Sequence, residues 1–154
     1  MGRSKLNRPK PGASHSIRAM TIADHGDVHR LWRNTAGICV VAEDSRERIA
    51  LYLSRNRGLC FVATVEGRIV GTILCGHDGR RGVLRHLAVR PAFRNRGIGR
   101  ALSERCRRAL CRQGIRKCNL YVMKDNPAGM RFWERLGYRL LDDDYRTLQS
   151  ATSG

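Results

Sequence analysis

The sequence predicts an α+β domain in which four helices cover a mixed, mostly antiparallel sheet of six to seven strands. Two observations predict this class. Short apolar runs separated by turn residues follow one another between residues 59 and 89, which is typical of antiparallel strands. Segments with helical periodicity lie on both sides of these runs, and the 154 residues are enough for one domain with its own core.

The first part of the chain is expected to form a tail, a strand and two helices. Residues 1–14 are basic, contain Pro, Gly and Ser and show no periodicity, so we expect a flexible tail before a single domain over residues 15–154. The elements expected next are a strand over 15–20, a helix over 21–37 and a helix over 42–58. Thr21 or Asp24 can cap the first helix, and Asp44 or Ser45 the second.

The remaining elements complete the sheet and add two helices. The expected order is strands over 59–65, 68–76 and 83–89, a helix over 97–113, a strand over 117–123, a short helix over 126–137, and a closing pair of strands within 138–150. Asn126 is expected to cap the short helix, with Pro127 at its first position and Gly137 at its end.

The chain carries a strong positive charge. Thirty Lys and Arg against 13 Asp and Glu give a net charge of +17, and residues 80–116 hold twelve arginines but one acid, Glu104. Such a field attracts polyanions, so non-specific nucleic-acid contact through the basic surface is expected, and a basic RNA- or ribosome-associated binding protein is an alternative function. An arginine-rich composition without any specific partner explains the charge equally well.

Several classes are disfavoured by what the sequence lacks. None of the six cysteines forms a C-x-x-C pair, and the N-terminal segment has no apolar core of a secretory signal. No run is apolar enough to span a membrane. We therefore expect a cytoplasmic monomer or homodimer with reduced thiols. His25 and His29 have the i, i+4 spacing of metal ligands, but no third ligand is evident, so no metal is expected.

The stretch "RNRGIG" (Arg94–Gly99) lies between a strand end and a helix start. It is no Walker A loop, because the Lys-Ser/Thr pair is missing, and Leu102 stands where a dinucleotide fingerprint needs Gly or Ala. The loop still has the physical features of a phosphate-binding site. The N–H groups of a helix's first turn lack intrahelical partners and carry the positive end of the dipole, and glycine lets a ligand approach the backbone. The loop is therefore expected to bind a pyrophosphate.

This loop, with its neighbours, resembles the GNAT superfamily of Gcn5-related N-acetyltransferases. The string "RNRGIG" fits the acetyl-CoA loop Q/R-x-x-G-x-G/A, "LRHLAVRPAFRNRGIGRAL" resembles the family's fourth strand, loop and third helix, and "NLYVMKDNPAGMRFWERLGYRL" resembles its fifth strand and fourth helix. The resemblance covers residues 15–148, and "GTILCGHDGRRG" is similar to small bacterial members of the YpeA-like type. It implies a sheet whose fourth and fifth strands splay apart.

The resemblance also implies how acetyl-CoA binds, with no metal. The backbone of strand four pairs with the pantetheine arm, the loop and helix start hold the pyrophosphate, and an asparagine lies near the pantetheine. Residue by residue, these are Leu87, Ala88 and Val89; Arg94, Asn95, Arg96, Gly97, Ile98, Gly99 and Arg100; and Asn126. Asn126 can serve as a helix cap at the same time.

The implied reaction is direct attack of a primary amine on the thioester in a ternary complex, with a small-molecule or protein amine as acceptor. His86 is a candidate base because histidine titrates near neutral pH; Asp78 and Glu66 are alternatives. Where the family often has a tyrosine as proton donor, this chain has Trp133, whose indole is no useful acid. Tyr138 and Tyr121 are alternative acids, no acid is a further option, and a domain that binds acetyl-CoA without turnover also stays open.

Overall fold

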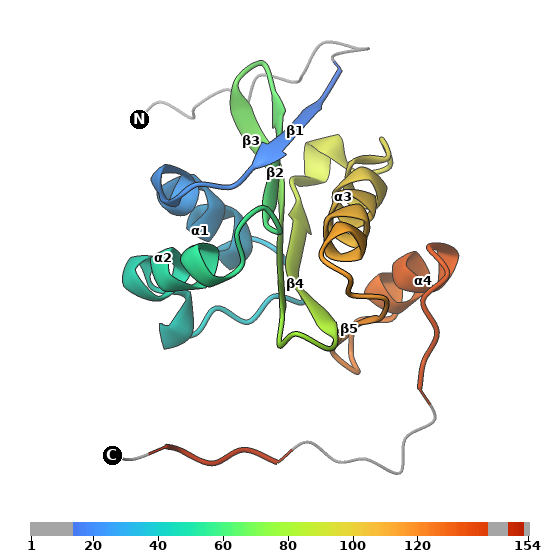
Figure 1. Cartoon of the computed structure of the whole chain (residues 1–154). Coiled ribbons are helices and arrows are strands. Elements are labelled where there is room, and N and C mark those ends of the chain that lie inside the picture. Colours follow the sequence, from blue (N-terminus) through green and yellow to red (C-terminus); the bar gives the residue numbers. More distant parts are fainter. Residues whose placement is uncertain (1–13, 142–147, 153–154) are drawn as a thin grey trace.

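The computed structural model describes residues 14–141 and 148–152. Its centre is one sheet with the order β1-β2-β3-β4-β5 (Figure 1). Neighbouring strands from β1 to β4 are antiparallel, and β4 and β5 are parallel. The strands are β1 (Ser16–Ala19), β2 (Phe61–Val65), β3 (Arg68–His77), β4 (Gly82–Val89) and β5 (Cys118–Leu120).

Four α-helices cover the two faces of this sheet, as predicted. Figure 1 shows α1 and α2 on one face and α3 and α4 on the other. The helices are α1 (His25–Arg33), α2 (Arg46–Arg55), α3 (Ile98–Arg112) and α4 (Pro127–Arg135), and the short 3-10 turns are η1 (Ile22–Asp24), η2 (Ala42–Asp44) and η3 (Pro91–Phe93). Within the described ranges, none of these helices has the length and apolar character needed to cross a membrane.

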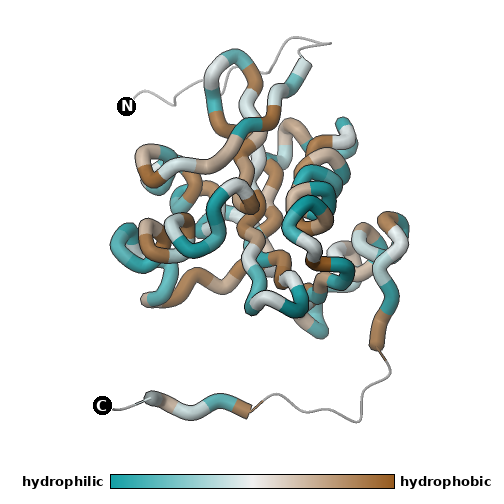
Figure 2. Tube along the Cα trace, in the orientation of Figure 1, coloured by the Kyte–Doolittle hydropathy of each residue, from teal (hydrophilic) through white to brown (hydrophobic). Residues whose placement is uncertain are grey.

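Each face of the sheet has its own hydrophobic core. On the α1–α2 face, the buried Trp32 of α1 packs with strand residues that include Val62 and Leu74. On the α3–α4 face, the buried Leu102 of α3 packs with strand residues that include Ile73. In Figure 2 the strands inside the molecule are largely hydrophobic, while much of α3 is hydrophilic. This two-layer burial is what the alternating apolar pattern predicts.

The prediction of six to seven strands is wrong for the described residues, which contain five. The expected closing strands fall within 138–150; residues 142–147, including Asp142–Asp144, lie outside the described ranges, and the described residues on either side form no strand. Leu140, Leu141 and Leu148 are exposed. The chain after α4 leads away from the sheet in Figure 1, and beyond Tyr138, which packs against the α3–α4 core, the described residues form no strand.

Two predicted elements are shorter in the structure, each for a local reason. The helix expected over 21–37 is divided, because the carboxylate of Asp24 turns back to the N–H of Thr21 and closes η1 before α1 begins. The strand expected over 117–123 ends at Leu120, because β4 and β5 pair over three residues of each strand and then diverge. The second helix is capped by Ser45, whose hydroxyl accepts the N–H of Arg48.

A β-bulge interrupts β4 in its middle. Arg85 is opposite Leu74 of β3 and Ala88 is opposite Thr72, so two residues of β4, His86 and Leu87, face a single residue of β3. His86 has a φ of 52°, in the left-handed region that non-glycine residues seldom adopt. Bulges of this kind bend a strand, re-aim a side chain and free backbone groups from the ladder.

Candidate active site

A pocket opens where β4 and β5 diverge. The two strands pair from Gly82 with Cys118 to Leu84 with Leu120, and beyond these pairs each strand leaves an edge unpaired with the other. The pocket is lined by the loop after α1, the second half of β4, the segment after β5 and part of α4: Ala36, Gly37, Ile38, Leu84, Arg85, His86, Leu87, Leu120, Tyr121, Val122, Met123, Asn126 and Trp133. It therefore gathers predicted site residues from three separate parts of the sequence.

The glycine loop leads directly into α3. Gly97 has a φ of 77° and is the N-cap residue, and the N–H of Ala101 makes the first intrahelical bond, to the carbonyl of Gly97 at 2.9 Å. The N–H groups of Ile98, Gly99 and Arg100 thus precede the helical hydrogen bonds of a 15-residue helix. This is the arrangement that holds an anion at a helix N-terminus.

Two loop arginines are held by local contacts. The Nε–H of Arg94 donates to the carbonyl of Val89 at 3.1 Å, and the Arg96 guanidinium lies 5.3 Å from the ring centre of Phe93. Asn95 between them has a φ of 59°. The loop is consequently fixed by its own side chains while its positive charges lie beside the start of α3.

Glycine is required at positions 97 and 99 of the loop for different structural reasons. A Cβ on Gly97 would meet open space, but its left-handed backbone favours glycine. A Cβ on Gly99 would lie 3.0 Å from Cζ of Phe132, so this glycine also lets α3 approach α4. From the sequence, both glycines of the loop were expected to let a ligand approach the backbone. The packing role of Gly99 was not expected, because it depends on Phe132, which lies 33 positions later and outside the loop motif.

Asn126 is the N-cap of α4, as predicted. Its Oδ1 accepts the N–H of Gly129 at 2.9 Å. The same side chain lies under the loop after α1, where a Cβ on Gly37 would be 2.6 Å from Nδ2. Asn126 thereby joins α4 to that loop at the wall of the pocket.

The structure separates the two candidate tyrosines. Tyr121 lines the pocket, is exposed, and has the Arg85 guanidinium 5.6 Å from its ring centre. Tyr138 is not among the pocket-lining residues: its hydroxyl lies 3.4 Å from Oγ of Ser103 and 3.7 Å from Sγ of Cys118. Burial raises the pKa of Tyr138, which makes it a weaker acid. Trp133 lines the pocket and packs edge-on against Tyr138.

His86 lines the pocket from within the bulge. Its Nε2 lies 2.9 Å from Oδ1 of Asp44, and its ring packs edge-on against Trp32 with centroids 4.8 Å apart. Sequence reasoning used Asp44 as a helix cap and missed this contact. The two residues are 42 positions apart, and nothing in the short stretch "AED" indicates which residue Asp44 contacts in the fold.

The other candidates lie elsewhere in the fold. Oδ1 of Asp78 accepts the N–H groups of Arg80 and Arg81 within a turn, and neither Asp78 nor Glu66 lines the pocket. In strand four, Leu87 lines the pocket, whereas Ala88 is buried on the α1–α2 face. His25 and His29 have ring centres 5.3 Å apart on α1.

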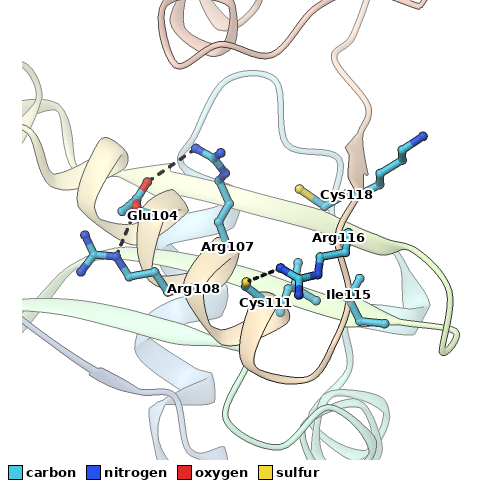
Figure 3. Close-up of a pocket in the computed structure, with 9 residues that line it drawn as sticks. Glu104, Arg107, Arg108, Cys111, Ile115, Arg116 and Cys118 are labelled. Atoms are coloured by element: carbon cyan, nitrogen blue, oxygen red, sulfur yellow. Dashed lines mark hydrogen bonds and ion pairs between the residues drawn. The ribbon is translucent and has the colours of Figure 1, made fainter.

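A second hollow lies between the end of α3 and the start of β5 (Figure 3). Arg107, Arg108, Arg116 and Lys117 line it together with Cys111 and Cys118, and Glu104 pairs with Arg107 and Arg108. It holds none of the predicted catalytic or acetyl-CoA residues. The pocket between β4 and β5 is therefore the candidate site.

Comparison with known proteins agrees with this geometry. Residues 26–138 match the model of the acetyltransferase (GNAT) family. The acetyltransferase SG1711 of Sodalis glossinidius (strain morsitans) is 36% identical over 126 residues, which are 82% of this chain and 88% of that protein. The chain therefore belongs to the GNAT family and is an acetyltransferase of the class that uses acetyl-CoA.

Solved structures share the fold at lower identity. The PaiA N-acetyltransferase from Thermoplasma acidophilum in complex with coenzyme A has a TM-score of 0.75 at 23% identity, over 85% of this chain and 93% of that chain. The diaminobutyrate acetyltransferase EctA from Paenibacillus lautus, in complex with L-2,4-diaminobutyric acid and coenzyme A, has a TM-score of 0.69 at 22% identity, over 80% and 75%. At such identities the likeness establishes the fold.

Proposed function

We propose that this protein transfers the acetyl group of acetyl-CoA to a primary amine by direct attack in a ternary complex. The observation that carries the proposal is the divergence of β4 and β5, which opens a pocket with His86 on its wall. Leu87 lines the same pocket, and a Cβ on Gly99 at the start of α3 would lie 3.8 Å from its side chain. The proposed base and the backbone groups proposed to bind the cofactor thus both belong to β4.

The described residues fit acetyl-CoA. The pyrophosphate would be held by the N–H groups of Ile98, Gly99 and Arg100, with positive charge from the loop arginines. The amides of the pantetheine arm need hydrogen-bond partners, and the β4 edge from Leu87 to Val89, unpaired with β5, can supply them. PaiA, which shares the fold, was solved with coenzyme A.

When bound, acetyl-CoA supplies a thioester, and the residues of this chain manage protons and charge around it. A C–N bond forms to the amine nitrogen as the C–S bond breaks. The amine loses one proton, which His86 accepts directly or through water, and the departing thiolate takes up one proton. A backbone N–H freed by the bulge near Leu87 donates to the acyl oxygen while negative charge develops there.

Tyr121 is the proposed proton donor to the thiolate. It lines the pocket, whereas Tyr138 directs its hydroxyl toward Ser103 and Cys118. Trp133 occupies the position seven residues after Asn126 and is buried. The proposed acid therefore comes from the segment after β5 and not from α4.

The proposed acceptor is a small-molecule or protein amine. EctA was solved with an amine substrate, L-2,4-diaminobutyric acid. A screen of amine classes with detection of free thiol tests the transfer: peptide N-termini, lysine side chains, aminoglycosides, polyamines and diamino acids. Release of coenzyme A that depends on one class supports the proposal. Saturable acetyl-CoA binding with no amine-dependent thiol release would identify a binding domain without turnover.

Gly97→Glu and Gly114→Glu form a matched pair for the cofactor site. Both glycines flank α3, with φ values of 77° and 79°, and a Cβ at either would meet open space. Only Gly97→Glu brings a carboxylate to the proposed pyrophosphate site, so calorimetry should show acetyl-CoA affinity lost in that variant and retained in Gly114→Glu. Equal affinity in both would contradict the assignment. Asn126→Ala should weaken binding and also remove a helix cap.

Nucleic-acid binding is a second proposal that the charge favours. Arg105, Arg107, Arg108 and Arg112 are on α3, and Glu104 is the one acid of that helix. RNA binding that falls steeply with salt and survives Gly97→Glu would support it. Binding that is absent at low salt would remove it.

A further inference from the structure

His86 is turned toward the α1–α2 face by the bulge in β4. Side chains of a regular strand alternate between faces, and Leu84 packs on the α3–α4 face, so alternation would place residue 86 there too. Instead His86 packs against Trp32 of α1, on the same face as Ala88. The left-handed backbone conformation of His86 is unfavourable in free energy for a non-glycine residue, so the contacts around its ring must stabilise it.

Asp44 faces His86 and is itself held on two sides. Its Oδ2 accepts the N–H of Val41 at 3.0 Å, and its backbone carbonyl lies 2.8 Å from Nε2 of His25. Asp44 is 6% exposed. Its remaining oxygen, Oδ1, is the one that lies 2.9 Å from His86 Nε2.

The contact between Asp44 and His86 is close but not aligned as a hydrogen bond, so Nε2 is a buried polar atom without such a partner among the described residues. A buried carboxylate needs a counter-charge, and within the described ranges the one basic side chain whose nitrogen lies within 4.0 Å of the Asp44 carboxylate is that of His86. The imidazolium that forms when His86 accepts the amine proton would supply that charge.

We propose that Asp44 is a positioning residue for His86. It holds the Nε2–H side of the ring, so that Nδ1 carries the lone pair that accepts the amine proton, and it stabilises the imidazolium that results. This inference rests on the proposed function for its catalytic consequence. The arrangement of the ring itself can be tested without turnover.

The other groups near His86 come from α1, η2, β4 and the segment after β5. Trp32 of α1 is uncharged and separates the ring from His29, whose centroid lies 6.5 Å from that of Trp32. The titratable and charged groups around the site are Asp44 of η2, His25 and His29 of α1, Arg85 of β4, and Tyr121 after β5. Asp44 is the anion among them.

The first test reads the ring directly. Imidazole ¹⁵N spectra of the full chain, assigned with His86→Asn, should show neutral His86 with its proton on Nε2 and none on Nδ1. A proton on Nδ1 would overturn the proposal whether or not the protein acetylates any amine. An inactive protein with the Nε2–H form would instead defeat the proposed function and leave the positioning contact intact.

The second test compares Asp44→Asn with Asp24→Asn, which removes a matched carboxylate from η1. Asp44→Asn should lower kcat by about 10- to 100-fold, the usual range for groups that orient a functional ligand, with acetyl-CoA affinity unchanged. The acidic limb of its pH–rate profile should move to lower pH, because a neutral amide no longer favours the imidazolium. Asp24→Asn should leave both unchanged.

A purely structural Asp44 would give a different pattern. Asp44→Asn would then lower the melting temperature as Asp24→Asn does, while kcat per folded molecule and the pH–rate profile would match those of the wild type. That outcome would overturn the proposal. Asp44→Glu supplies a rescue arm, since it restores the charge and should recover part of the lost rate.

Discussion

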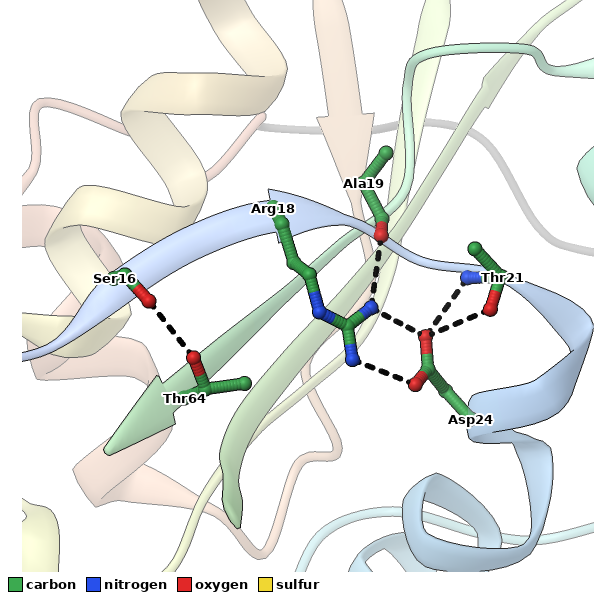
Figure 4. Close-up of polar contacts among 6 residues, drawn as sticks. All are labelled: Ser16, Arg18, Ala19, Thr21, Asp24 and Thr64. Atoms are coloured by element: carbon green, nitrogen blue, oxygen red, sulfur yellow. Dashed lines mark hydrogen bonds and ion pairs between the residues drawn. The ribbon is translucent and has the colours of Figure 1, made fainter. Parts of the chain in front are cut away.

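The two 3-10 turns η1 and η2 share the same local hydrogen bond but differ in what their aspartates contact. Asp24 ends η1 and Asp44 ends η2; each is largely buried, and each accepts the N–H of the residue three positions earlier, at 2.9 Å from Thr21 and 3.0 Å from Val41. The difference lies in the partner. Figure 4 shows Asp24 paired with Arg18 of β1. Asp44 instead faces His86 of β4.

The two partners differ in whether they titrate. Arg18 binds Asp24 through two nitrogens, at 2.7 and 2.8 Å, and arginine stays charged at every pH at which proteins fold. The Arg18 guanidinium holds the pKa of the Asp24 carboxyl below its ordinary value. An imidazole can take up and release a proton, and the imidazole of His86 lines the pocket. A permanent cation suits a structural joint, and a titratable one suits proton transfer.

The largest effect is expected from His86→Asn, which breaks the η2 pair. Asparagine tolerates the left-handed backbone of this position, so the fold should persist while the proposed base is lost. Loss of a general base typically costs 10²- to 10⁴-fold, so kcat/KM should fall by about 100-fold or more. The check is steady-state kinetics with the best amine of the screen, and full activity in a folded variant would refute the role of His86.

Arg18→Gln breaks the η1 pair and should act on stability. The variant leaves the Asp24 carboxylate, which is 9% exposed, with weaker partners, so the free energy of unfolding should drop. The drop should be about 1–2 kcal/mol and no larger, because Arg18 is itself half-exposed and solvent screens the pair. Urea unfolding measures the change. The kcat of the folded fraction should be unaffected; a large loss of kcat would mean that η1 also serves the site.

The η1 pair should also show a pH dependence at acid pH. Because the pKa of folded Asp24 is below its ordinary value of 3.8, the stability it contributes is complete above that value and is lost as pH falls through the folded pKa. The stability difference between wild type and Asp24→Asn should therefore be constant near neutral pH and shrink below about pH 4. A difference that grows on acidification would have the wrong sign.

Thr21→Val should have the smallest effect, and it sharpens the match between the turns. Val41 occupies the equivalent position in η2, and the hydroxyl of Thr21 makes a long contact of 3.3 Å with Asp24. Removing it should cost about 0.5–1 kcal/mol by urea unfolding, with the backbone bond of η1 kept. A cost of several kcal/mol would show that η1 depends on a bond that η2 lacks.

The sequence by itself determined most of the fold and the residues of the proposed cofactor site. Alternation and helical periodicity gave the order of the elements through α4, because each pattern is local and reflects which side chains one element buries. The positions of Gly97 and Asn126 followed from backbone and capping preferences, which act over a few residues.

The tertiary structure alone decided how the residues proposed to handle protons are arranged. The bulge that turns His86, the divergence of β4 from β5, and the separation of Tyr121 from Tyr138 all depend on which strands pair and where pairing stops. The closing strands expected from local pattern are absent from the described residues, where Leu140, Leu141 and Leu148 are exposed. Asp44 and Asp24 read alike in the sequence, and only the chain's path through space gives one an arginine and the other a histidine.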